Sequence, residues 1–217
     1  MIAVLFLTTL LAQQDPTYAE LSKKHGLGAA DQNMREGKYL EAAVAYRNVL
    51  MSPGDREAVR IPLALALLAK GDAVYAGIEI RRAHLLYPDF SRLAIDAAEL
   101  FGSKGALAKL VDARAGKAAE GDEAEVNAAA TYAYLIDGER DRAQAALTKY
   151  VQLRGSDAFA KDLKSMLARA PAGKPPAASP PATAAAPTPL TQGGAPVRAG
   201  TRFIESEARP RGEILFK

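Results

Sequence analysis

The chain has 217 residues, 49% of them hydrophobic, which is enough for a core in one or two domains and excludes a chain disordered throughout. It contains no cysteine, which excludes disulfides, thiolate metal sites and cysteine nucleophiles, and it has only two histidines. The net charge of +3 lies in the C-terminal part, because residues 1–170 hold 22 basic and 22 acidic side chains. A neutral body gives no basic face, so we expect no nucleic-acid partner.

An uncharged apolar run covers residues 2–11 and is followed by the small residue Ala12. A helix over this run would be about 15 Å long, which is too short to cross a hydrocarbon core of about 30 Å. The run fits the apolar region of a secretory signal, so we predict that residues 1–14 are a signal peptide and that the protein is exported, to the periplasm or outside the cell. The alternative is a buried N-terminal helix or strand, because no Lys or Arg precedes the run. No other segment is apolar for about 18 residues, so we expect no transmembrane helix.

Residues 37–50 carry the first clear helical pattern. Apolar side chains recur there at spacings of three and four and share one face: Tyr39, Ala42, Ala43, Tyr46, Val49 and Leu50. Ser52-Pro53-Gly54 ends this helix, since Pro and Gly interrupt helices, and Asp55 can cap the next one.

The same pattern returns after 34 residues. Five pairs have this spacing: Ala30 and Ala64, Gly37 and Gly71, Ala42 and Ala76, Tyr46 and Ile80, and Val49 and Ala83. A fixed period in this range is typical of stacked helical hairpins. Glycine suits the turn between two helices, alanine lets them touch, and proline ends the unit, as Pro53 and Pro88 do here.

Further helices are predicted at residues 55–70, 123–136, 138–150 and 156–170, with a weaker hairpin at 91–101 and 106–119. The copy at Gly138 begins 67 residues after Gly71, one residue short of two periods. Pro62 removes a hydrogen bond inside helix 55–70, and we expect a kink there in preference to a later start near Ile61. The last helix is expected to cap the array with one apolar face formed by Phe159, Leu163, Met166 and Leu167.

The composition changes at residue 171, and eight of the thirteen prolines lie between Pro171 and Pro196. Such a stretch cannot bury a core, so we predict that residues 171–217 form a disordered Pro/Ala-rich tail. Its end carries apolar residues between charges: Phe203, Ile204, Ile214, Leu215 and Phe216. The alternative for this end is a short docking peptide on a tether.

The repeating unit resembles that of the tetratricopeptide repeat family. The second unit fits the family pattern best, with Gly71, Asp72, Ala76, Ile80, Ala83 and Pro88 at the family's spacing. The resemblance covers residues 21–155, in three to four partly degenerate repeats. The tryptophan common in the family is absent, and the fourth unit has Gly155 near the position of the proline. The resemblance implies an all-α fold for residues 15–170, a right-handed α-solenoid of stacked helical hairpins.

The resemblance also implies a groove, lined by the first helix of each hairpin, that receives a peptide or a protein surface. By register its residues are Lys24, Leu27, Asp31 and Met34 in the first unit, Ala58, Ile61, Leu65 and Leu68 in the second, and Ala124, Asn127, Thr131 and Tyr134 in the fourth. The family's carboxylate clamp uses Lys and Asn, but Leu27 and Asp31 stand at those places in the first unit.

No catalytic, phosphate-binding or dinucleotide-binding motif is present in the sequence. We interpret His25 and His84 as surface residues of helices, and the acidic residues 120–125 as a helix N-terminus rather than a metal site. The sequence therefore predicts a non-catalytic interaction scaffold without cofactor or metal, which binds a protein or peptide partner. The alternative is an auxiliary subunit or adaptor whose residues 198–217 make the main partner contact.

Overall fold

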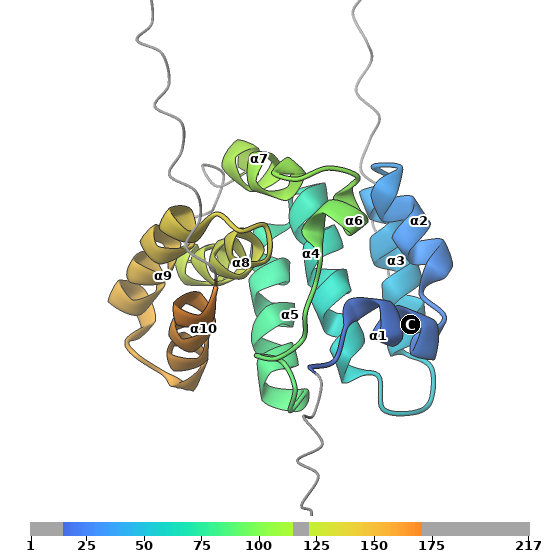
Figure 1. The fold of residues 1–217 in the computed structure, drawn as a ribbon, viewed down its shortest axis with the longest axis horizontal. Helices are drawn as coiled ribbons and strands as arrows, with labels where there is room; N and C mark the ends of the chain where they lie inside the picture. The colour runs from blue at the N-terminus through green and yellow to red at the C-terminus, as the bar shows by residue number, and fades with distance from the viewer. Residues whose placement is uncertain (1–14, 115–121, 171–217) are drawn as a thin grey trace, which may run out of the picture. The chain divides into compact units, whose positions relative to one another are not determined.

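The computed structural model describes residues 15–114 and 122–170, so the predicted signal peptide and tail, and residues 115–121, lie outside the described part. Within these ranges the chain is all-α, as predicted, and its only β pairing is an isolated bridge between Thr17 and Ala94 (Figure 1). The helices are α1 (Tyr18–His25), α2 (Gly28–Arg35), α3 (Tyr39–Leu50), the 3-10 helix η1 (Glu57–Val59), α4 (Arg60–Lys70), α5 (Ala73–Leu86), α6 (Ala97–Phe101), α7 (Ala106–Arg114), α8 (Glu123–Ile136), α9 (Arg140–Arg154) and α10 (Ala158–Arg169).

One type of hydrogen-bonded turn joins α1 to α2 at Gly26 and also joins the helices of three later pairs. Its glycine has a left-handed backbone, with φ of 73° at Gly37, 108° at Gly71 and 79° at Gly138. The residue after the glycine donates its backbone N–H to a carbonyl five residues back: Lys38 to Asn33, Asp72 to Leu67, and Glu139 to Tyr134. The glycine donates to a carbonyl three residues back: Met34, Leu68 and Leu135. These two bonds form a Schellman motif, so α2, α4 and α8 end in the same way.

The second helices of these pairs also bury equivalent residues. Helix α3 begins at Tyr39 and α5 begins at Ala73, which repeats the 34-residue spacing of the sequence. The small residue one turn into each helix is fully buried: Ala42, Ala76 and Ala143. A larger buried residue follows four positions later: Tyr46, Ile80 and Leu147. Three helical hairpins, α2–α3, α4–α5 and α8–α9, therefore share one local plan.

The α8–α9 hairpin packs directly against α5, and the two helices α5 and α8 lie side by side (Figure 1). The approach is closest at Gly77, where an added Cβ would lie 2.1 Å from the carbonyl oxygen of Glu125. Helices α6 and α7 do not lie between α5 and α8, because α6 packs on α2 and α7 packs on α4 and α8. The weaker hairpin expected at 91–119 is thus not stacked between the second and the last hairpin.

Three local expectations were wrong. Helix α4 begins at Arg60, after the 3-10 turn η1, so Pro62 lies in its first turn. Backbone N–H groups in the first turn make no hydrogen bond within the helix, so the lack of an N–H at Pro62 requires no kink. Residues 91–96 are not helical, because the backbone of Ala94 pairs with Pro16 and Tyr18. The first helix of the first unit is split into α1 and α2 at Gly26, whose φ is 67°.

Among the described residues, no helix combines the length and the apolar character that a membrane span requires.

Candidate functional site

The residues predicted to line a groove are for the most part inside the protein. Ten of the twelve are buried: Leu27, Asp31, Met34, Ala58, Ile61, Leu65, Leu68, Ala124, Thr131 and Tyr134. Only Lys24 is exposed, and Asn127 is half-buried. The twelve side chains therefore do not form one open surface in this conformation, and the first helices of the hairpins serve as the core of the described part.

Several of these buried polar residues have structural partners. The Asp31 carboxylate accepts three hydroxyl hydrogen bonds, from Tyr18 at 2.5 Å, Ser22 at 2.5 Å and Tyr46 at 2.6 Å. Tyr18 and Ser22 belong to α1, whereas Tyr46 belongs to α3, so Asp31 joins α1 to the first hairpin. Burial raises the pKa of both tyrosine hydroxyls, with further contributions from the Asp31 charge, which keeps them protonated as donors.

Polar residues of the last hairpin are also engaged within the protein. The Tyr134 hydroxyl donates to the Asp112 carboxylate at 2.7 Å, and the Thr131 hydroxyl donates to the backbone carbonyl of Asn127 at 2.7 Å. Burial and the acceptor Asp112 raise the pKa of Tyr134. The hydroxyl groups of both residues are therefore engaged in hydrogen bonds within the described part of the chain.

The two histidines differ in their surroundings. His25 is half-buried at the C-terminus of α1. The expectation of a surface position was wrong for His84, because its side chain is only 11% exposed and its ring lies edge-on to Phe90 and Phe159. Its Nε2 lies 2.8 Å from the Asp162 carboxylate, which ties α10 to α5.

Glu125, one of the acidic residues near the start of α8, pairs with two arginines. Its Oε1 accepts from Arg81 at 2.6 Å and from Arg154 at 2.9 Å, and the residue is buried. Within the described ranges, no group of three or more His, Asp or Glu residues is arranged to hold a metal ion.

An exposed apolar groove lies on a different side of the hairpins from the one predicted. We call it the α3–α5 groove; it has a volume of about 350 Å³ and is lined by Leu40, Ala43, Val44, Arg47, Leu67, Lys70, Asp72 and Tyr75. Three large apolar residues on its walls are more than half exposed: Leu40 at 55%, Val44 at 51% and Tyr75 at 64%. Such a concentration of exposed apolar side chains is uncommon unless the surface is covered by a partner.

The sequence carried a signal for this groove that the core pattern obscured. Leu40 and Val44 recur at i and i+4, which places them on one face of α3, away from the face that holds Ala42 and Tyr46. A helix with large apolar residues on two faces needs cover on both.

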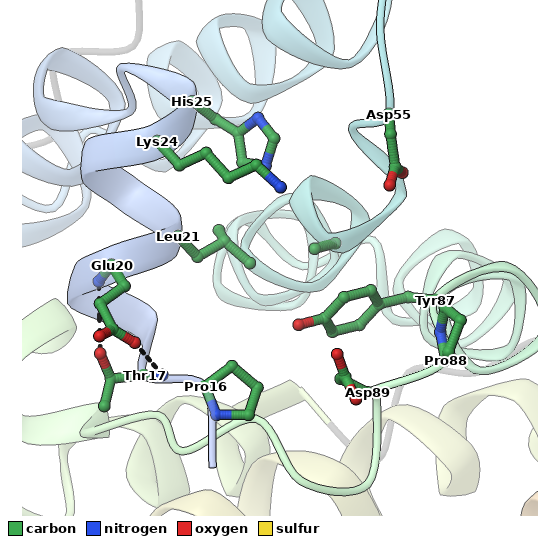
Figure 2. A pocket seen from close by; sticks show the side chains of 11 residues that line it. Pro16, Thr17, Glu20, Leu21, Lys24, His25, Asp55, Tyr87, Pro88 and Asp89 are labelled. Carbon is green, nitrogen blue, oxygen red and sulfur yellow. Dashed lines mark hydrogen bonds between the residues drawn. The ribbon is translucent and has the colours of Figure 1, made fainter. Parts of the chain in front are cut away.

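A second hollow, of about 360 Å³, lies beside α1 and is shown in Figure 2. Three separate segments form it: residues 16–25, residues Asp55 and Ala58 around η1, and residues 87–89 after α5. It includes two of the predicted groove residues, Lys24 and Ala58. Both hollows have charges of both signs, but only the α3–α5 groove is lined by large apolar side chains that are more than half exposed.

Comparisons with protein-family models, with curated proteins and with solved structures find no match to this chain.

Proposed function

We propose that the protein is a non-catalytic interaction module: a short, right-handed α-solenoid of tetratricopeptide type that is exported and binds a protein or peptide partner. The Schellman turns at Gly37, Gly71 and Gly138 support the repeat architecture because a fully buried alanine follows each of these glycines after five residues, which is not so at Gly26. The buried alanines are Ala42, Ala76 and Ala143.

The α3–α5 groove carries the proposal that a partner binds. Apolar surface is exposed to water at Leu40, Val44 and Tyr75. Burial of such surface against a partner is favourable by about 25 cal/mol for each Å² removed from solvent. Tyr75 is also the residue type expected at the centre of an interface, because a large ring buries much area and orders few rotatable bonds.

The charges around the groove specify the chemistry of the partner. Arg47 has no ion-pair partner among the described side chains, and it lies one turn from Val44 on α3. The Lys70 ammonium and the Asp72 carboxylate form an ion pair at 2.5 Å on the far wall. The groove therefore fits a segment with two or three large apolar side chains and one carboxylate that meets Arg47.

Binding should be tested with the full chain by cross-linking in the periplasmic or secreted fraction, followed by affinity measurement on the partner so identified. The variant Val44→Ser/Tyr75→Ser should weaken binding at least about tenfold, because it removes two apolar anchors from the groove. Arg47→Glu should also weaken it, through repulsion of the partner's carboxylate.

A matched control is available at the other end of α5. Leu85 and Leu86 are exposed to 75% and 51%, but neither lines the groove. Leu85→Ser/Leu86→Ser should leave affinity unchanged; equal affinity of all the variants would refute the groove. Deletion of residues 198–217 tests the alternative adaptor function, which would be favoured if only that deletion abolished binding.

A further inference from the structure

The hollow beside α1 brings together residues that are far apart in the sequence. Leu21 and Ala58 are buried and form an apolar floor, and Pro16 and Pro88 lie at its edges (Figure 2). Its volume of about 360 Å³ is near the lower end of the range of about 300–1,000 Å³ typical of small-molecule sites. The α3–α5 groove has a similar volume, so the choice between a small ligand and a protein segment rests on the lining, which here has a buried floor and no large, exposed hydrophobic side chain of the kind that lines the groove.

Opposite charges face this hollow from different segments. Lys24 projects into it from α1, and Asp55 lies on the other side, in the segment before η1 (Figure 2). Neither side chain has a hydrogen bond or ion pair with another described side chain. The other two carboxylates of the lining are engaged, because Asp89 pairs with Arg92 and Glu20 caps the start of α1. One ammonium and one carboxylate thus remain for a ligand.

Two further groups have protonation states that suit this arrangement. Burial and the neighbouring charges of Lys24 and Arg56 lower the pKa of His25, so its imidazole is neutral at neutral pH and Lys24 supplies the positive charge. Burial and the Asp89 charge raise the pKa of Tyr87, whose hydroxyl therefore stays protonated. Figure 2 shows this hydroxyl directed toward α1, where it can donate to an acceptor near Lys24.

We propose that this hollow binds a small zwitterion, a free dipeptide with an apolar side chain. Lys24 and the Tyr87 hydroxyl hold its carboxylate, Asp55 holds its ammonium group, and Leu21 and Ala58 contact the side chain. The two charges of an extended dipeptide are about 7 Å apart, which suits groups on different walls better than the adjacent charges of a single amino acid. This site is separate from the α3–α5 groove, and neither proposal depends on the other.

The test uses the dipeptide Ala-Leu and the full-length, isotopically labelled chain, with binding followed by amide NMR shifts of residues 21–25, 55–58 and 87–89. We expect saturable shifts with a Kd of about 1 mM, as suits a small ligand held by exposed charges. N-acetyl-Ala-Leu lacks the ammonium group and Ala-Leu-amide lacks the carboxylate, so each should bind about two- to fivefold more weakly.

Variants then assign each charge to its residue. Lys24→Gln should lose most of the preference for Ala-Leu over Ala-Leu-amide, with the Tyr87 hydroxyl as the remaining contact to the carboxylate. Asp55→Asn should bind Ala-Leu and N-acetyl-Ala-Leu equally, because it has lost the group that distinguishes these two ligands. Lys23→Gln and Asp141→Asn make the same charge changes at exposed positions outside the hollow and should retain both preferences. Absence of saturable shifts, or preferences that persist in Lys24→Gln and Asp55→Asn, would overturn the proposal.

Discussion

Substitution of Gly77 by alanine tests the direct contact between α5 and α8. The added Cβ would lie 2.1 Å from the carbonyl oxygen and 2.6 Å from the carbonyl carbon of Glu125, whereas ordinary contacts begin at 3.4 Å. The obstacle is backbone, so the helices must separate by roughly 1 Å, at a cost near the upper end of the 1–3 kcal/mol typical of overpacking. Alanine regains about 1 kcal/mol of helix propensity. The free energy of unfolding should therefore fall by about 2 kcal/mol.

Urea unfolding followed by far-UV circular dichroism measures this change. Gly28→Ala is the matched control, because Gly28 is helical, its φ is not positive, and no atom lies within 4 Å of an added Cβ. That variant should be as stable as the wild type or more stable by up to about 1 kcal/mol. If Gly77→Ala were as stable as Gly28→Ala, then α5 and α8 would not approach as described, and the stacking of the last hairpin on the second would be refuted.

Three further predictions concern buried polar groups. Asp31→Asn should lower the free energy of unfolding by about 1–3 kcal/mol in the same urea assay, because an amide cannot accept all three hydroxyl bonds, and unchanged stability would contradict the buried cluster. Folding raises the pKa of Tyr46 and Tyr132 above the ordinary value of about 10. Above about pH 10 the unfolded chain therefore loses protons that the folded chain keeps. The free energy of unfolding should be unaffected by these tyrosines below about pH 10 and should fall above it, by up to about 1.4 kcal/mol per pH unit for each tyrosine. Tyrosinate absorbance should accordingly rise together with loss of helicity, and ionisation of all the tyrosines in a folded chain would be inconsistent with this. Glu125→Gln should cost about 1–2 kcal/mol, since it weakens the buried acceptor of Arg81, and thermal unfolding that matches the wild type would argue against that ion pair.

The repeated hairpins could be predicted because their signals are local. The left-handed turn at Gly71 and the close helix contact at Ala76 are set by neighbours within one or two helical turns. The roles of these two residues can therefore be inferred from the nearby sequence. The boundaries of α8 were predicted as observed for the same reason. The start of α4 was misplaced, because Pro62 is compatible both with a kink and with a first helical turn, and only the 3-10 turn η1 distinguishes the two.

The segment between α5 and α8 could not be placed from local signals. Its helices α6 and α7 have apolar residues, and their spacing alone resembled a weak repeat. Their position depends on distant partners: Asp137 accepts from the backbone N–H groups of Gly105 and Ala108, and Ala94 pairs with Pro16 and Tyr18. Such contacts, far apart in the sequence, leave no periodic pattern.

Most of the groove residues implied by the family's register are buried in this chain, which the register alone could not indicate. Nearly the whole of α4 is buried, from Ile61 to Ala69, since η1, α3, α5, α7 and α8 all pack around it. A first helix surrounded in this way contributes to stability, and only its C-terminal end, at Leu67 and Lys70, reaches the α3–α5 groove. Parts of the outer faces of α3 and α5 remain uncovered, and Leu40 and Tyr75 lie there. A partner that uses the α3–α5 groove would contact α3, the start of α5 and the C-terminal end of α4. Substitutions at Ile61 and Leu65 of α4, which do not line the groove, should therefore affect binding only as far as they unfold the protein.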